Sequence, residues 1–407
     1  MKRNTIRTIV TELGGQDLRK KLVTKKNILE NYTKGKCTGA TEQNPWNTNE
    51  LLSVVLNKHN RIPKHREMLR GLVTRPPLPH FRFRPRRYCG SREMDQDISQ
   101  REVEVLRVKK RCAFRLCNVS SYTTEIMEIR ADNPRLHVLL IPGNPGGVPF
   151  YKDFVEALYE LLGGTASVTA VGHISHTKKN WEHGRLFSLQ DQINHKMDFI
   201  KHELQNTAVP ILLVGHSIGS YISMEMFRRS PEKVTYCVGL YPFLALNPQS
   251  TKQSLIWKIA ESRILCVALS LIVALLGLLP ISLLRLIVTT FLGKSWSAAA
   301  VEAACSHLVK YHIMRNILFM AMTEFQKLSE TPDWAFMKEN QHKIAFLFGI
   351  DDHWGPLQMF EEIAKQVPDA ALSIEREGHT HGFCCTEAGS LWVAEHVASL
   401  IKNKVSL

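Results

Sequence analysis

The pentapeptide Gly215-His216-Ser217-Ile218-Gly219 has residue types and spacing that fit a nucleophilic serine. It follows the apolar run 211–214, which is typical of a buried strand, and precedes a helical pattern that begins at Ile218. A sharp strand-to-helix turn is sterically crowded, so small residues are needed two before and two after the serine. The turn exposes the serine oxygen above the free N–H groups of a helix start. We therefore predict a nucleophile elbow, with Gly215 and Gly219 as its small residues.

A serine nucleophile needs a base, and the base needs an acid that orients it. In proteins with this elbow, the acid and then the histidine follow the serine along the chain. The apolar run 343–350 is typical of a late strand, and Asp351 and Asp352 follow it. We predict Asp352 as the acid because it lies deeper in the loop. Asp351 is the alternative and would otherwise cap the turn.

Two histidines further along the chain are candidates for the base. His379 follows a glycine, and His381 stands in a His-x-Phe setting. Both histidines follow the acid along the chain, so the residue pattern does not decide which of them is the base. His353 in the acid loop is expected to be a loop or pocket residue. His216 in the elbow is expected to line the site or to hydrogen-bond a neighbouring strand.

Acyl transfer also needs N–H donors for the oxyanion. One donor should be the backbone N–H of Ile218, directly after the serine. The other should come from the loop 142–147, P-G-N-P-G-G, which follows the apolar run 137–141. Pro145 has no N–H, so Asn144 is the natural donor. The alternative interpretation of this loop is an ordinary Gly/Pro turn.

Other chemistries find no support in the sequence. It contains no phosphate loop of the form G-x-x-x-x-G-K-[ST], no G-x-G-x-x-G after the first predicted strand and no zinc-type His/Cys cluster. His379 and His381 lack a third ligand nearby. We therefore expect no metal and no cofactor.

Strand and helix patterns alternate around these residues, which predicts a mostly parallel sheet with helices on both faces. Predicted strands span 137–142, 167–171, 210–214, 234–240, 343–350 and 372–375. Predicted helices span 150–162, 190–205, 218–229, 358–366 and 391–401.

An apolar stretch at 264–293 interrupts this alternation, within a cap region that we place at 243–335. Its 21 uncharged residues between Arg263 and Arg285 are long enough to cross a bilayer. Pro280 should end or kink a helix there, because proline lacks the backbone donor. We expect two short helices in a hairpin that lies in a membrane or droplet monolayer without crossing it. A single transmembrane span and a buried pair of cap helices are the alternatives.

The net charge of +14 comes from the first quarter of the chain. Residues 1–111 hold 26 Lys and Arg against 11 Asp and Glu, whereas residues 112–407 hold 26 against 27. The run at 75–87, R-P-P-L-P-H-F-R-F-R-P-R-R, has no helical or strand period. Such a composition cannot bury enough apolar surface to offset chain entropy. We expect a largely disordered basic extension at 1–111 and an α/β domain at 112–407.

The extension could contact anionic lipid or RNA, or direct the chain to an organelle. We favour the interpretation of an extension without a function over these roles. No specific nucleic acid partner is expected. The nine cysteines include no C-x-x-C pair, which indicates reduced thiols in a cytosolic setting. Adjacent Cys384 and Cys385 are expected to pack as small apolar residues.

Four segments together resemble the lipid droplet-associated hydrolase family of the α/β-hydrolase superfamily, most closely its plant members. They are L-I-P-G-N-P-G at 140–146 followed by Phe150-Tyr151, V-G-H-S-I-G at 214–219, Asp352-His353-Trp354 with Pro356 two further on, and His381-Gly382-Phe383. The similarity covers about residues 112–407. It implies an α/β-hydrolase fold with Ser217 as nucleophile, Asp352 as acid and His381 as base. The family has His-Ala-Phe where this chain has His381-Gly382-Phe383, and the acid-to-base spacing favours His381 over His379.

The resemblance also implies a function and a location. The family has a central apolar segment associated with droplet binding, which corresponds to 264–293. It implies an esterase acting on lipid esters, with sterol esters the usual assignment, at the cytosolic face of lipid droplets and the endoplasmic reticulum. A droplet-binding structural or regulatory protein with weak hydrolysis is the alternative. Acyl transfer to an alcohol is a third possibility, because a triad does not select the acceptor.

Overall fold

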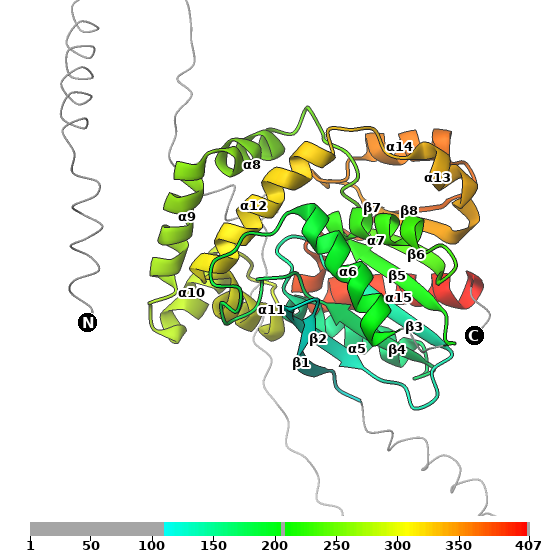
Figure 1. Ribbon diagram of the computed structural model, residues 1–407, viewed down its shortest axis with the longest axis horizontal. Coiled ribbons are helices and arrows are strands. Elements are labelled where there is room, and N and C mark those ends of the chain that lie inside the picture. Colours follow the sequence, from blue (N-terminus) through cyan, green and yellow to red (C-terminus); the bar gives the residue numbers. More distant parts are fainter. Residues whose placement is uncertain (1–109, 205–207, 405–407) are drawn as a thin grey trace, which may run out of the picture. The chain divides into compact units, whose positions relative to one another are not determined.

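The computed structural model describes residues 110–204 and 208–404 (Figure 1). The predictions for residues 1–109, which include the basic run at 75–87, Cys37 and Cys89, lie outside the described residues.

Eight strands form one sheet in the order β1-β2-β4-β3-β5-β6-β7-β8. The neighbours from β4 to β8 are parallel, and β1 and β2 form an antiparallel edge. The strands are β1 Ala113–Val119, β2 Tyr122–Ile129, β3 Leu136–Ile141, β4 Ala166–Val171, β5 Ile211–His216, β6 Val234–Leu240, β7 Ile344–Gly349 and β8 Ala371–Glu375.

The six parallel strands occur where they are predicted, with ends that differ by at most two residues. Parallel strands that are covered on both faces read as continuous apolar runs, which makes them easy to find. The antiparallel strands β1 and β2 are not among the predicted elements. The residues of β2 are buried or half-buried without strict alternation, and β1 is mostly exposed, including Phe114 and Leu116. This mixture weakens the sequence signal of an edge pair.

Helices cover both faces of the sheet, as predicted (Figure 1). On one face lie the 3₁₀ turn η2 (Val148–Tyr151), α5 (Lys152–Leu161) and α15 (Glu387–Lys404). On the other face lie α6 (Leu189–Glu203), α7 (Ile218–Arg229) and α14 (Leu357–Gln366). The predicted helices all occur, although α15 begins four residues before the predicted start at 391.

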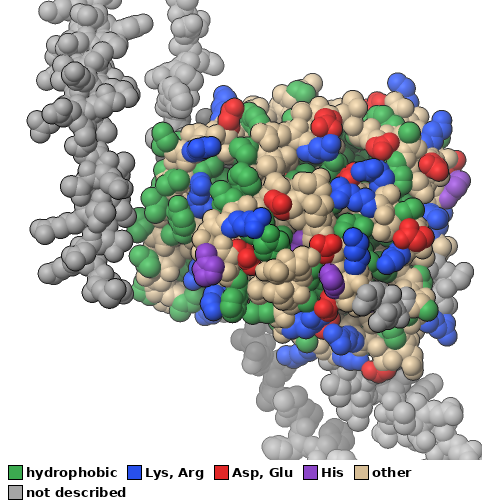
Figure 2. Space-filling view, viewed as in Figure 1, with side chains coloured by type: hydrophobic (Ala, Val, Ile, Leu, Met, Phe, Trp, Pro, Cys, Tyr) green, Lys and Arg blue, Asp and Glu red, His purple; other side chains and the backbone are tan. Residues whose placement is uncertain are grey.

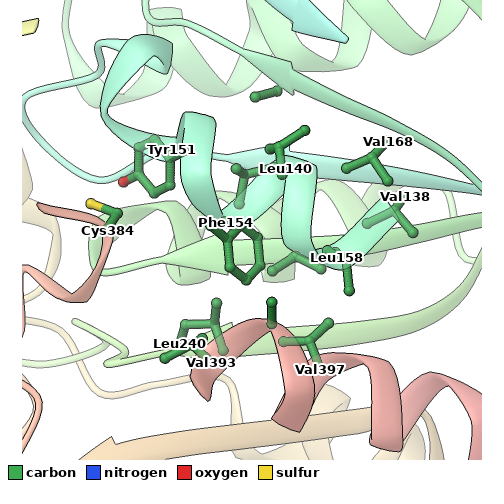
Figure 3. Packing of buried hydrophobic residues seen from close by; sticks show 14 of the residues in the cluster. Val138, Leu140, Tyr151, Phe154, Leu158, Val168, Leu240, Cys384, Val393 and Val397 are labelled. Carbon is green, nitrogen blue, oxygen red and sulfur yellow. The ribbon is translucent and has the colours of Figure 1, made fainter. Parts of the chain in front are cut away.

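Alternate side chains of each central strand enter two separate apolar cores. Val138 and Leu140 of β3 face α5 and α15, whereas Leu139 and Ile141 face α6 and α7. Figure 3 shows the first core, where Val138 and Leu140 meet side chains of both helices. Each fully buried aliphatic side chain contributes roughly 1.5–3 kcal/mol. The two cores hold the strand ends in a fixed register.

Several helices lie between β6 and β7 in the sequence. They are α8 (Thr251–Glu261), α9 (Arg263–Leu276), α10 (Ile281–Phe291), α11 (Ala298–Ala303), the π-helix η3 (Ala304–Leu308), α12 (Tyr311–Lys327) and α13 (Trp334–Glu339). The 3₁₀ turn η4 (Gln341–Lys343) then leads into β7, and η5 (Phe383–Cys385) precedes α15.

The apolar stretch forms two helices, α9 and α10, and the helix break falls at Gly277–Pro280. The alternative of a buried helix pair is wrong, because most of the large apolar side chains of both helices are exposed. Ile264 of α9 is 81% exposed and Leu286 of α10 is 61% exposed. Figure 2 shows hydrophobic side chains gathered at the edge formed by these helices. No single helix among the described residues is long and apolar enough to cross a bilayer, and α8 and α9, which pass that test together, are bent by 98°.

The seven described cysteines are unpaired. Cys384 and Cys385 lie in the core between the sheet, α5 and α15, which confirms the prediction that they pack as apolar residues.

The first core should be sensitive to Phe154, which is fully buried and packs edge-on against Phe383 at 5.6 Å between ring centroids. We expect Phe154→Ala to lower the free energy of unfolding by about 3–5 kcal/mol, because it leaves a cavity. Urea unfolding followed by circular dichroism measures this. The matched control is Phe114→Ala, whose ring is 45% exposed on β1. Equal losses in both variants would contradict this account of the core.

Candidate active site

The structure forms the predicted elbow between β5 and α7. Ser217 has φ 55° and ψ −123°, a left-handed conformation that is uncommon for serine and typical of this turn. Its N–H donates to Leu240 O at 3.0 Å, and its carbonyl accepts from Phe243 N–H at 3.1 Å. These bonds to the end of β6 and to the segment after it hold the strained residue in place. The side chain is almost buried, with 7% of Ser217 exposed.

Both predicted small residues of the elbow are sterically required. A Cβ atom on Gly215 would collide with the backbone of Gly219, and one on Gly219 would collide with the carbonyl of Ile141. A Cβ atom on Gly143 would lie only 3.0 Å from Cβ of Ser217. The loop after β3 therefore packs directly on the elbow. This follows from the register, in which Ile141 of β3 pairs with Gly215 of β5.

The structure brings together Asp352 and His381. Asp352 Oδ2 accepts from His381 Nδ1 at 2.8 Å, and Asp352 Oδ1 accepts from Trp354 N–H at 2.9 Å. The carboxylate side chain is 1% exposed and the imidazole is 23% exposed. A buried carboxylate with both oxygens bonded holds the ring in one orientation and keeps the proton on Nδ1. Nε2 is left to accept a proton.

The two alternative residues lie elsewhere. Asp351 is exposed, and no hydrogen bond joins it to His381. His379 packs its ring against Trp392, with 5.9 Å between centroids. Of the four candidates, only Asp352 and His381 form an acid–base pair.

His216 connects the base to the rest of the site through a hydrogen-bonded chain. Its Nε2 donates to the carbonyl of His381 at 2.8 Å, so its Nδ1 is the acceptor in the neutral ring. Tyr151 Oη lies 2.6 Å from that Nδ1 and accepts from Gly143 N–H at 3.0 Å. Burial lowers the pKa of His216 well below its usual value, which keeps the ring neutral. The predicted role of His216 as a residue lining the site agrees with this placement.

The ring of His381 lies 5.0 Å from the ring of His216 and so stands beside the elbow. Among the described residues, the hydroxyl of Ser217 forms no hydrogen bond with His381. Such bonds are often long in proteins without substrate. Proton transfer would require this contact to close.

In the loop after β3, Asn144 carries the N–H group that is predicted to bind the oxyanion. Gly143 N–H donates to Tyr151, Gly146 N–H donates to His176 Nδ1 at 2.9 Å, and Pro145 has none. The N–H of Asn144 makes no hydrogen bond within the described part of the chain. Ile218 is the first residue of α7, and a first-turn N–H has no partner inside its helix. Both predicted oxyanion donors are therefore available.

Two further residues form hydrogen bonds with residues of this site, and neither is among the predicted site residues. Tyr151 bridges the loop and the elbow, and Glu324 of α12 accepts from Asn144 Nδ2 at 3.1 Å. Tyr151 follows the motif at 140–146, which gave no indication of its role, and Glu324 belongs to no motif. Each meets its partner only in the folded chain. Within the described ranges, no group of three or more His, Cys, Asp or Glu residues is arranged to hold a metal ion.

The fold and the elbow define an α/β hydrolase, and solved structures support this class. An epoxide hydrolase from Vigna radiata superposes with a TM-score of 0.53 at 15% identity, covering 72% of this chain and 99% of that one. A haloalkane dehalogenase from Bradyrhizobium elkani superposes with a TM-score of 0.54 at 15% identity, covering 72% and 98%. Identities this low show the fold alone.

Similarity in sequence to known proteins shows the family. The family model described as "Lipid-droplet associated hydrolase" matches residues 134–384. Proteins named lipid droplet-associated hydrolase match from Gallus gallus, with 31% identity over 61% of this chain and 80% of that one, and from Dictyostelium discoideum, with 27% identity over 69% and 94%. This chain belongs to the lipid droplet-associated hydrolase family, which confirms the resemblance.

The hydrogen-bonded chain through Tyr151 gives a stability prediction. We expect Tyr151→Phe to lower the free energy of unfolding by about 1–3 kcal/mol, because it leaves buried His216 Nδ1 and Gly143 N–H without a partner. Chemical denaturation measures the loss. The matched control is Tyr236→Phe, since the buried hydroxyl of Tyr236 has no hydrogen-bond partner among the described residues. A loss in the control as large as in Tyr151→Phe would refute the role of the chain.

Proposed function

We propose that this protein is a serine hydrolase that cleaves carboxylic esters of lipids, sterol esters among them. The observation that supports this most directly is the Asp352–His381 pair at 2.8 Å, set beside an elbow that holds Ser217 at φ 55°. The pair matches the base-and-acid arrangement that a serine nucleophile requires.

In the proposed reaction, Ser217 Oγ attacks the ester carbonyl carbon while its proton passes to His381 Nε2. Asp352 stabilises the charged imidazole through Nδ1–H. The N–H groups of Asn144 and Ile218 bind the negative oxygen of the tetrahedral intermediate, which is the position where charge develops. His381 then gives the proton to the departing alcohol. Water attacks the acyl-serine by the reverse sequence and releases the fatty acid.

We further propose that α9 and α10 bind the phospholipid monolayer of a lipid droplet, or the cytosolic face of the endoplasmic reticulum, without crossing it. Leu275, Leu278 and Leu286 of this hairpin are 64%, 79% and 61% exposed. Transfer of exposed apolar surface to lipid gains roughly 25 cal/mol per Å². The single charge inside the stretch, Arg285, is paired with Glu302 at 2.7 Å. The family name carried by the relatives agrees with a droplet location.

The second candidate function is a droplet-binding structural or regulatory protein with weak hydrolysis. The exposed apolar face of α9 and α10 favours it, because that face needs no contribution from Ser217 to bind lipid. A contact of residues 1–111 with anionic lipid, which the basic composition allows, would serve either function.

A fluorophosphonate probe tests the nucleophile. We expect wild-type protein to become covalently labelled and Ser217→Ala to lose labelling and ester turnover by at least about a thousandfold. The matched control is Ser223→Ala in α7, the helix that follows Ser217. The buried hydroxyl of Ser223 has no hydrogen-bond partner within the described residues, so this variant should label normally. Full labelling of Ser217→Ala would rule out this mechanism. An unlabelled wild type that is folded and supplied with lipid surface would favour the structural role.

Flotation with triacylglycerol droplets coated by phosphatidylcholine tests the lipid contact. We expect the double variant Leu275→Asp, Leu278→Asp to lose most of its droplet binding, because two charges would have to enter the monolayer. The control Leu116→Asp changes a residue that is 51% exposed on β1 and should bind normally. Labelling by the probe shows that the variants are folded. Unchanged flotation of the double variant would exclude this hairpin as the lipid contact.

A further inference from the structure

The side chain of Asn144 joins the oxyanion loop to helix α12. Its Nδ2 donates to the carbonyl of Ile317 at 3.0 Å and to Glu324 Oε1 at 3.1 Å. Its Oδ1 is buried and has no hydrogen-bond partner among the described residues. Buried amide oxygens are nearly always bonded, so a donor is expected at this position.

Glu324 is a buried carboxyl group that the proposed reaction does not use. It is 3% exposed, and burial raises the pKa of Glu324 to about 8, opposed only by the hydrogen bond from Asn144. The carboxyl group is therefore mostly uncharged at neutral pH. Helix α12 packs on α6, α8, α9 and η3. No charged or titratable group of these elements shifts the pKa of Glu324; Lys196 of α6, Lys258 of α8, Arg263 of α9 and His307 of η3 are among those groups.

An uncharged carboxyl group supplies the missing donor. It carries one acceptor oxygen and one O–H donor, and a primary amide carries the complementary pair. Asn144 Nδ2 already donates to one oxygen of Glu324, and a proton on the other oxygen can donate to Asn144 Oδ1. Loss of that proton turns both carboxyl oxygens into acceptors. It also places a negative charge next to the residue whose N–H would bind the oxyanion.

We propose that Glu324 is a positioning residue for ester hydrolysis. Its uncharged carboxyl group, on helix α12 of the cap, hydrogen-bonds both polar atoms of the Asn144 side chain and thereby holds the oxyanion loop in the position that the reaction needs. This inference rests on the proposed function. It predicts that the site loses activity when Glu324 ionises, although Glu324 touches neither the substrate carbonyl nor the catalytic triad.

The first experiment measures the rate of fluorophosphonate labelling from about pH 6 to about pH 10. It uses the full chain, with Ser217→Ala as the blank. We expect the wild-type rate constant to fall as the pH rises through about 8, approaching tenfold per pH unit. Glu324→Gln should keep the neutral rate within about threefold and lose this decline, because glutamine offers one donor and one acceptor without ionising. Glu324→Leu should be slower at every pH.

The second experiment follows thermal unfolding and needs no activity. The pKa of Glu324 should be about 4.3 in the unfolded chain, whereas it is raised to about 8 in the folded chain. Between these two pH values the folded chain therefore binds one proton more than the unfolded chain. The free energy of unfolding falls as the pH rises from the lower value to the higher one. Relative to Glu324→Gln, the wild-type unfolding constant should rise by up to about tenfold per pH unit there and level off above it.

The control for both experiments is Glu330→Gln, which changes an exposed glutamate paired with Lys327 and should alter neither profile. The proposal is overturned if Glu324→Gln keeps the alkaline decline in labelling, or if the stability difference from wild type does not change with pH. Failure of the proposed function would look different, because wild-type protein would then remain unlabelled at every pH.

Discussion

The close approach of backbone segments around Ser217 governs the geometry of the whole site. The loop after β3 and the turn after β5 occupy neighbouring positions because Ile141 pairs with Gly215. Side chains at Gly215 or Gly219 would collide with backbone atoms, which cannot move without displacing the strands. This packing keeps Ser217 in a conformation that a free chain would rarely adopt. It also sets the loop after β3 directly against Ser217, so that both positions follow from one strand register.

Buried hydrogen bonds then align the remaining parts of the site with that turn. Asp352 fixes the ring of His381, and His216 holds the carbonyl of the same residue. Tyr151 connects His216 to the loop after β3. These groups come from four segments that are distant in the sequence. Each bond is worth little by itself, but an unpaired buried group is costly, and the network therefore favours a single arrangement. Neutral His216 is part of this arrangement, because its two nitrogens must act as one donor and one acceptor.

The cap has two sides with different physical roles. Its outer side, formed by α9 and α10, exposes apolar side chains that water solvates poorly, which suits contact with lipid. Its inner side, at α12, hydrogen-bonds Asn144 through Ile317 and Glu324. Helix α12 also packs against α9. A continuous set of packed helices therefore extends from the proposed lipid contact to the oxyanion loop. Under the proposed function, binding at the lipid surface and the geometry of the reacting group involve the same part of the chain.

Local patterns of residues were sufficient to predict the parallel strands, the elbow and the break at Pro280. Each depends on a rule that acts within a few residues: continuous apolar runs, the need for small residues around Ser217, and the missing donor of proline. The same patterns narrowed the acid and the base to neighbouring pairs, because chain order can be read directly but side-chain orientation cannot. The folded chain was needed to show that Asp352 meets His381 while His379 packs against Trp392. It was needed as well for the edge strands β1 and β2, the bridge through Tyr151 and the carboxyl group of Glu324. Glu324 meets Asn144 across 180 residues of sequence, and the mixed exposure of β1 and β2 weakens their strand pattern. A side chain that meets its partner only through packing leaves no periodic pattern in the sequence.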